Sequence, residues 1–159
     1  MLHPGARWAS KLWPPASWAS LSEWFRGQGF VVAVTGSRAD RELVAGITAQ
    51  CRAPVVNLAG RTSLAQLAGI FRQARLAVTT DTGAMHLAAS LGTKVAALFG
   101  PTAPWRTGPF GDGHQIVRLG LPCSPCFKRQ CPAPRCLNDL SPEMVEAACE
   151  KILSVRPIS

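Results

Sequence analysis

The 159-residue chain lacks several features that mark specialised classes of protein. No apolar run approaches the length of about 18 residues that a membrane span needs, and the N-terminus lacks the basic and apolar regions of a secretory signal. There is no run of five basic residues and no basic motif interleaved with aromatic residues, which argues against a nucleic-acid-binding arm. Hydrophobic residues make up 47% of the chain and charged residues 16%, as in a globular domain.

Acidic residues are scarce relative to basic ones. The chain has 17 lysine and arginine residues against 9 aspartate and glutamate residues, a formal net charge of +8. Such a surface favours anionic partners, which include nucleotides, nucleic acid and acidic lipids. The charge alone does not choose among them, because the arginines are scattered along the chain.

The apolar residues form two kinds of pattern, short continuous runs and helical spacing. Short apolar or β-branched runs predict buried strands at residues 30–34, 54–58, 76–80 and 95–99. Helical spacing predicts helices at residues 15–25, at 40–50, from Ser63, at 83–91 and at about 141–154. This alternation predicts an α/β fold in which a parallel sheet has helices on both faces. After Gly100 the pattern predicts an irregular loop that runs to about Asn138.

Four of the six cysteines lie in a loop at about residues 120–138, with the spacing Cys123-x2-Cys126-x4-Cys131-x4-Cys136. Four thiolates at short spacing can form a tetrahedral zinc site, although the second gap is wider than in a standard zinc knuckle. Without a secretion signal, disulfides are disfavoured. We therefore consider two hypotheses, a structural zinc site and reduced loop thiols, ahead of a catalytic role.

The turn that follows the strand at 76–80 carries the most informative polar residues. Thr82-Gly83 opens a helix, whose free backbone N–H groups attract anions such as a diphosphate. Gly83 permits close approach of a ligand, Asp81 can accept hydrogen bonds from sugar hydroxyls, and His86 can donate to a phosphate. The alternative interpretation is that Asp81 is an ordinary N-cap and His86 a surface residue.

Four ordered segments resemble the heptosyltransferase family of glycosyltransferases (glycosyltransferase family 9), which acts in lipopolysaccharide core biosynthesis. The strongest is Asp81–Gly92 together with the strand and Phe99-Gly100-Pro101-Thr102 that follow it. The other three are His3-Pro4-Gly5-Ala6-Arg7 with Ser10-Lys11 and Trp13-Pro14, then Gly60-Arg61-Thr62-Ser63-Leu64, and Thr107-Gly108-Pro109. The resemblance covers nearly the whole chain.

The resemblance implies the GT-B fold, with two Rossmann-like domains and an active site between them. Residues 1–159 match only the C-terminal, donor-binding domain, so the acceptor domain and its general base are absent. No full strand precedes Pro4, where a Rossmann-like domain has its first strand, so the sequence looks truncated. The alternative to an enzyme fragment is a non-catalytic split-gene half, or a decayed fragment, that binds nucleotide or a partner domain.

The implied reaction transfers heptose from ADP-heptose to the lipopolysaccharide inner core, with no cofactor required. The acceptor would bind through the missing domain, and the implied location is the cytoplasm, with peripheral association with the inner membrane as an option. Nucleic acid is not an expected partner.

The resemblance also assigns roles to individual residues. Lys11 matches a lysine that contacts the donor phosphates and stabilises the leaving group. The donor-contacting residues that match family positions are Arg7, Lys11, Thr62, Asp81, Thr82, Gly83 and His86. Arg7 stands where some family members have a residue whose hydroxyl group contacts phosphate, so the resemblance implies only a contribution of positive charge from Arg7. Glu42 is a further candidate for contact with the donor nucleoside, with an ordinary place on a surface helix as the alternative, and Trp105 is a candidate for sugar contact.

Overall fold

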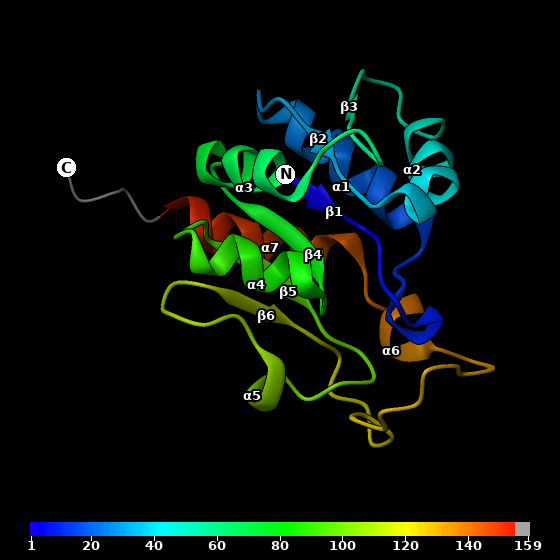
Figure 1. The fold of residues 1–159 in the computed structure, drawn as a ribbon. Helices are drawn as coiled ribbons and strands as arrows, with labels where there is room; N and C mark the ends of the chain where they lie inside the picture. The colour runs from blue at the N-terminus through cyan, green and yellow to red at the C-terminus, as the bar shows by residue number, and fades with distance from the viewer. Residues whose placement is uncertain (155–159) are drawn as a thin grey trace.

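The computed structural model describes residues 1–154, which form a six-stranded parallel sheet between two layers of helices (Figure 1). The spatial order of the strands is β3-β2-β1-β4-β5-β6. Their bounds are β1 Leu2–His3, β2 Ala33–Val34, β3 Val56–Asn57, β4 Ala77–Thr80, β5 Val95–Leu98 and β6 Gln115–Val117. The predicted α/β class and the parallel sheet are confirmed.

The helices include two 3₁₀ turns, η1 Ala9–Lys11 and η2 Arg38–Asp40. The α-helices are α1 Pro15–Gly27, α2 Arg41–Thr48, α3 Leu64–Gln73, α4 Gly83–Ser90, α5 Pro104–Thr107, α6 Arg135–Asn138 and α7 Pro142–Ser154. In residues 1–154, none of these helices combines the length and the apolar character that a membrane crossing requires.

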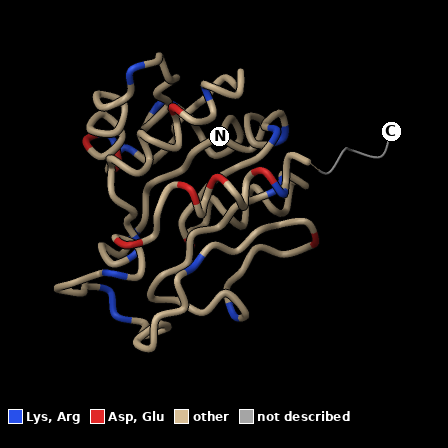
Figure 2. Tube along the Cα trace, turned by 180° about the vertical axis from the view of Figure 1, so that it is seen from behind, with Lys and Arg blue, Asp and Glu red and all other residues tan. Residues whose placement is uncertain are grey.

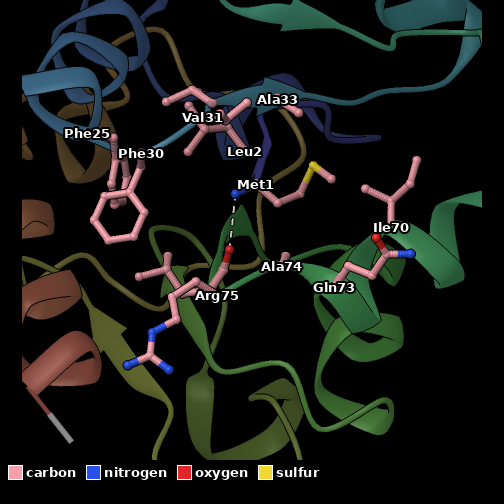
Figure 3. A pocket seen from close by; sticks show the side chains of 12 residues that line it. Met1, Leu2, Phe25, Phe30, Val31, Ala33, Ile70, Gln73, Ala74 and Arg75 are labelled. Carbon is pink, nitrogen blue, oxygen red and sulfur yellow. Dashed lines mark hydrogen bonds between the residues drawn. The ribbon is translucent and has the colours of Figure 1, made fainter. Parts of the chain in front are cut away.

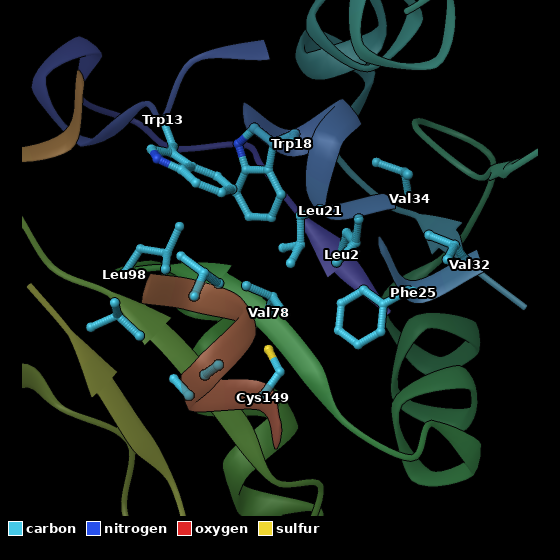
Figure 4. Close-up of a cluster of buried hydrophobic side chains, with 14 of the residues drawn as sticks. Leu2, Trp13, Trp18, Leu21, Phe25, Val32, Val34, Val78, Leu98 and Cys149 are labelled. Carbon is cyan, nitrogen blue, oxygen red and sulfur yellow. The ribbon is translucent and has the colours of Figure 1, made fainter. Parts of the chain in front are cut away.

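Both faces of the sheet are buried, and successive residues of a strand face opposite helix layers. In β4, Ala77 packs with α3 and α4, whereas Val78 packs with α1, α2 and α7. The cluster on the second face contains Leu2, Trp18, Phe25 and Cys149 (Figure 4). Because each strand residue meets a helix on one face or the other, the strands appear as continuous apolar runs in the sequence.

The prediction of an irregular segment from Gly100 to Asn138 is wrong in part. This segment contains the edge strand β6 and the short helices α5 and α6. A three-residue edge strand has too few residues to show a period, and only its pairing with β5 defines it. Similarly, the segment before Pro4 contributes a two-residue strand, which pairs with both β2 and β4.

Trp13 connects the N-terminal segment to the start of α7. Its indole Nε1–H donates to the carbonyl oxygen of Leu140 at 2.8 Å, and both residues are about 1% exposed. Its ring meets that of Trp18 edge to face, with centroids 5.1 Å apart (Figure 4). A buried donor that satisfies a buried carbonyl stabilises this junction, because the carbonyl has no access to water.

We expect the Trp13→Phe substitution to lower the free energy of unfolding by about 1–3 kcal/mol, because it leaves the carbonyl of Leu140 buried without its donor. Urea unfolding followed by circular dichroism measures the loss. Trp24→Phe is the control, since Trp24 is only partly buried at the edge of the same cluster. Equal losses in the two variants would contradict the role of the hydrogen bond.

Candidate functional site

A cavity beside polar loops lies at the carboxyl edge of the sheet, where the strand order reverses between β1 and β4. It has a volume of about 650 Å³ and is lined by residues from the ends of β1 and β2 and from the starts of α3 and α4. Ligands of open parallel sheets bind at such a reversal, because the chain leaves the two strands in opposite directions and opens a crevice.

A second cavity, of about 390 Å³, lies at the opposite edge of the sheet (Figure 3). Its lining is mostly apolar and includes Phe30 and Val31. The α-amino group of Met1 donates to the carbonyl of Leu76 at 3.0 Å there, and Arg75 is the only charged side chain in the lining. It lacks the convergent polar groups of the first cavity, so we assign the candidate site to the carboxyl edge.

The N-terminus of α4 faces the first cavity with its backbone donors uncapped. Thr82 is the N-cap, and in residues 1–154 its side chain makes no capping bond and its buried Oγ1 has no partner. A Cβ added to Gly83 would meet no atom within 4 Å, so the space in front of the first turn is open. The neighbouring helix α3 differs, because Ser63 and Gln66 cap it reciprocally. The free donors of α4 thus form a site for an anion.

Lys11 lies next to this helix end and is held there by Asp81. Its Nζ donates to Asp81 Oδ2 at 2.8 Å and to the Asp81 carbonyl oxygen at 3.0 Å, and the two side chains are 15% and 7% exposed. Thr107 Oγ1 lies 3.4 Å from the same carboxylate oxygen, and the Trp8 ring centroid is 4.5 Å from Nζ. Asp81 is therefore not the N-cap of α4; its carboxylate positions an ammonium group beside the turn.

Asp40 lines the cavity, and the sequence analysis did not identify it. Its Oδ2 accepts hydrogen bonds from the backbone N–H and the hydroxyl of Ser37, at 2.7 and 2.6 Å. A Cβ on Gly5 would lie 2.6 Å from the Asp40 carboxyl carbon, and one on Gly36 would lie 2.8 Å from its Cβ. The two glycines therefore make room for this carboxylate, whereas Glu42 is exposed and lies outside the lining. The serine–aspartate capping box after β2 was the available sequence signal.

His3 lines the same cavity as a neutral ring. Its Nδ1 lies 3.0 Å from Thr35 Oγ1, whose hydroxyl donates to the Leu2 carbonyl at 3.3 Å. The contact with the Thr35 hydroxyl therefore orients the imidazole ring at the cavity. Burial lowers the pKa of His3, and the nearby charge of Asp40 opposes this shift only in part. The cavity thus offers one carboxylate and one neutral imidazole.

The structure brings together most of the residues that the sequence assigned to the donor. Arg7, Thr62, Thr82 and Gly83 line the cavity, and Lys11 and Asp81 lie beside it. His86 is exposed on α4 and is not part of the lining, and Trp105 is an exposed residue of α5. The phosphate contact of His86 and the sugar contact of Trp105 remain predictions.

The four loop cysteines do not form a metal centre. Within residues 1–154, no group of three or more His, Cys, Asp or Glu side chains is arranged to hold a metal ion, so the zinc prediction is not supported. Cys123 is exposed, whereas the Cys136 sulfur packs over Gly100, 2.9 Å from the position of an added Cβ. Burial, together with the neighbouring cysteines, raises the pKa of the Cys136 thiol.

Curated relatives of the chain are heptosyltransferases. It is 34% identical to lipopolysaccharide heptosyltransferase 1 of Pseudomonas aeruginosa, over 94% of this chain and 46% of that protein. It is 31% identical to lipooligosaccharide heptosyltransferase 2 of Campylobacter jejuni, over 96% of this chain and 50% of that protein. The chain thus spans about half the length of these two relatives.

Comparison with solved structures and with family models gives a consistent result. The fold matches that of Escherichia coli ADP-heptose lipopolysaccharide heptosyltransferase II with a TM-score of 0.83 and 29% identity, covering 96% of this chain and 45% of that one. The model of glycosyltransferase family 9 (heptosyltransferase) matches residues 1–137. On these grounds the chain belongs to glycosyltransferase family 9, the heptosyltransferase family.

Proposed function

We propose that this chain is the donor-binding half of a heptosyltransferase and that it holds ADP-heptose in the cavity of about 650 Å³. The observation that carries the proposal is the uncapped N-terminus of α4, with the Lys11 ammonium fixed beside it. Helix N–H groups and a positioned cation are the groups that bind a diphosphate without a metal. The structural similarity to the E. coli ADP-heptose lipopolysaccharide heptosyltransferase II supports the same donor.

In the proposed reaction, an acceptor hydroxyl of the lipopolysaccharide inner core attacks the anomeric carbon of the heptose. The bond between that carbon and the diphosphate oxygen breaks, and ADP leaves with the electron pair. Lys11 and the α4 N-terminus stabilise the charge that develops on the diphosphate. The Asp40 carboxylate accepts hydrogen bonds from donor hydroxyl or amino groups, and His3 supplies a further polar contact, since both line the cavity.

A general base must accept the proton of the acceptor hydroxyl. We propose that a residue of the acceptor-binding half of the enzyme supplies this base. Asp81 is bound by Lys11, and Asp40 is bound by Ser37. We therefore assign both carboxylates to the positioning of neighbouring groups and the binding of donor, and not to the role of general base. The chain by itself is expected to bind donor with little or no turnover, which is also the behaviour of a non-catalytic split-gene half. Activity after addition of a separate acceptor half distinguishes a functional donor-binding half from a decayed fragment.

We expect Lys11→Met to weaken ADP binding by roughly 10- to 100-fold, because it removes a charge-assisted contact with the diphosphate. Adenosine binding should change little, since adenosine has no phosphate. Isothermal titration calorimetry with both ligands measures the difference. Lys94→Met is the matched control, because Lys94 is exposed and its ammonium bonds only to the backbone of Asp112 in residues 1–154. Equal ADP affinities for the Lys11 and Lys94 variants would contradict the assignment.

We expect Gly83→Ala to weaken ADP binding and to leave the protein as stable as the wild type or more so. The added methyl group meets no protein atom within 4 Å, but it occupies the space through which a diphosphate would approach the helix. Gly69→Ala on α3 is the matched control, because its Cβ is equally unobstructed and it lies outside the cavity. Urea unfolding and ADP titration are measured on both variants. A Gly83 variant that binds ADP normally would rule out diphosphate contact at this turn.

A further inference from the structure

A further cavity, of about 410 Å³, lies beside the turn that follows β3. Its lining residues come from α2, from β3 and from that turn, and they are Arg41, Ala45, Asn57, Ala59 and Arg61. It shares no lining residue with the proposed donor cavity, but the two are neighbours. Arg41 directly follows Asp40 of the donor cavity, and Arg61 directly precedes Thr62 of the donor cavity.

The charge of this cavity is positive and is not balanced by carboxylates. The net charge of +8 does not by itself mark a site, because lysine and arginine positions are scattered over the trace (Figure 2). This cavity, however, is lined by two arginines and by no acidic residue. The ion pairs that form within residues 1–154 involve neither Arg41 nor Arg61. Asp40 and Glu42 flank Arg41 in the sequence, but neither of them belongs to the lining.

Arg41 is held in place by the backbone of Gly60. Its Nη2 donates to the Gly60 carbonyl oxygen at 3.1 Å. Gly60 has a φ of +64°, and a Cβ at this position would lie 2.6 Å from Arg41 Nε. A glycine therefore satisfies two requirements here, the left-handed backbone and the close approach of the guanidinium group. The N–H groups of Arg41 that Gly60 does not use remain free to bind a ligand.

Asn57 is oriented as a further donor. Its Oδ1 accepts a hydrogen bond from the backbone N–H of Ala59 at 3.0 Å. Because a backbone N–H can only donate, this bond identifies the side-chain oxygen and leaves the two N–H groups of the amide as donors. The Arg61 side chain makes no hydrogen bond within the part of the chain that the structure describes. Side-chain hydrogen bonds left to make in this cavity thus come from two guanidinium groups and one amide nitrogen.

A cavity with these donors and no carboxylate favours an anionic ligand. The planar N–H fork of a guanidinium group matches pairs of oxygen atoms on phosphate or carboxylate. Three side chains supply donors here, and a phosphoryl group presents three terminal oxygens to meet them, whereas a carboxylate presents two. The donor set therefore fits a phosphoryl group better than a carboxylate.

We propose that this cavity binds a phosphoryl group, either as inorganic phosphate or on a phosphorylated metabolite. Arg41 and Arg61 bind its oxygens from two elements, and the Asn57 amide adds a neutral donor. The binding uses none of the residues assigned to ADP-heptose, so it stands apart from the proposed function.

The test is titration of the isotope-labelled full chain with inorganic phosphate, followed through the backbone amide shifts in NMR spectra. We expect saturable shifts at Arg41, Ala59 and Arg61. Phosphate that binds at the N-terminus of α4 shifts the amides of Gly83 and Ala84 instead, so each site has its own signals. Ionic strength is held constant with sodium chloride, because salt screens exposed charges.

We expect Arg61→Gln to weaken phosphate binding at this cavity roughly 10-fold, because it removes a charge-assisted contact. The substitution breaks no side-chain hydrogen bond within residues 1–154, so folding should be unaffected. Arg72→Gln is the matched control, since it removes the same charge from an exposed position on α3 outside the cavity, and it should bind phosphate as the wild type does. ADP affinity should stay within a few-fold of wild type in both variants.

Equal phosphate affinities for the Arg61 and Arg72 variants, shifts confined to Gly83 and Ala84, or acetate binding as tightly as phosphate would each overturn the proposal. Glycerol phosphate distinguishes the two sources of the phosphoryl group. Tighter binding of this ester than of inorganic phosphate assigns the cavity to a phosphorylated metabolite, and equal or weaker binding assigns it to free phosphate. Because ADP binding is measured separately, failure of the donor assignment leaves this result unchanged.

Discussion

The ion pair between Lys11 and Asp81 is the interaction on which the geometry of the carboxyl edge depends. It joins two residues that are 70 positions apart, one after β1 and one after β4. Both side chains are nearly buried, so the pair is poorly screened and each group needs the other. Because the ammonium also bonds to the Asp81 carbonyl, the lysine is fixed at the start of α4. The same pair therefore organises the turn and places a cation beside uncapped helix donors.

Sheet topology explains why the other residues of the site meet there. The order β3-β2-β1-β4 places the loops after β1 and β2 opposite the start of α4. Gly5 and Gly36 then admit the Asp40 carboxylate between the two loops, since any larger residue would overlap it. Ser37 holds that carboxylate, so the glycines and the capping box act together. The shape of this cavity thus depends on small residues as well as on charged ones.

Local signals in the sequence predicted a large part of this architecture. The signals for β4 and β5 are strong because every residue of these strands is buried, and the signal for α4 is strong because its buried residues recur at helical spacing. The strand β6 was missed because its three residues have no period of their own and Ile116 is 40% exposed. The zinc prediction is not supported within residues 1–154, for a related reason. Cysteine spacing is a local property, whereas the position of the Cys136 sulfur over Gly100 is a tertiary contact.

The sequence by itself determined the fold class, the family and the turn from Asp81 to His86, because periodicity and short motifs are properties of neighbouring residues. Only the tertiary structure decided that Asp81 holds Lys11, that Asp40 rather than Glu42 lines the cavity, and that His86 lies outside it. Folding also brings Arg41 of α2 and Arg61 of the turn after β3 to one cavity, although neither lies in a basic run of the sequence. The two residues are distant along the chain, and the pairing of β3 with β2 helps to bring them together.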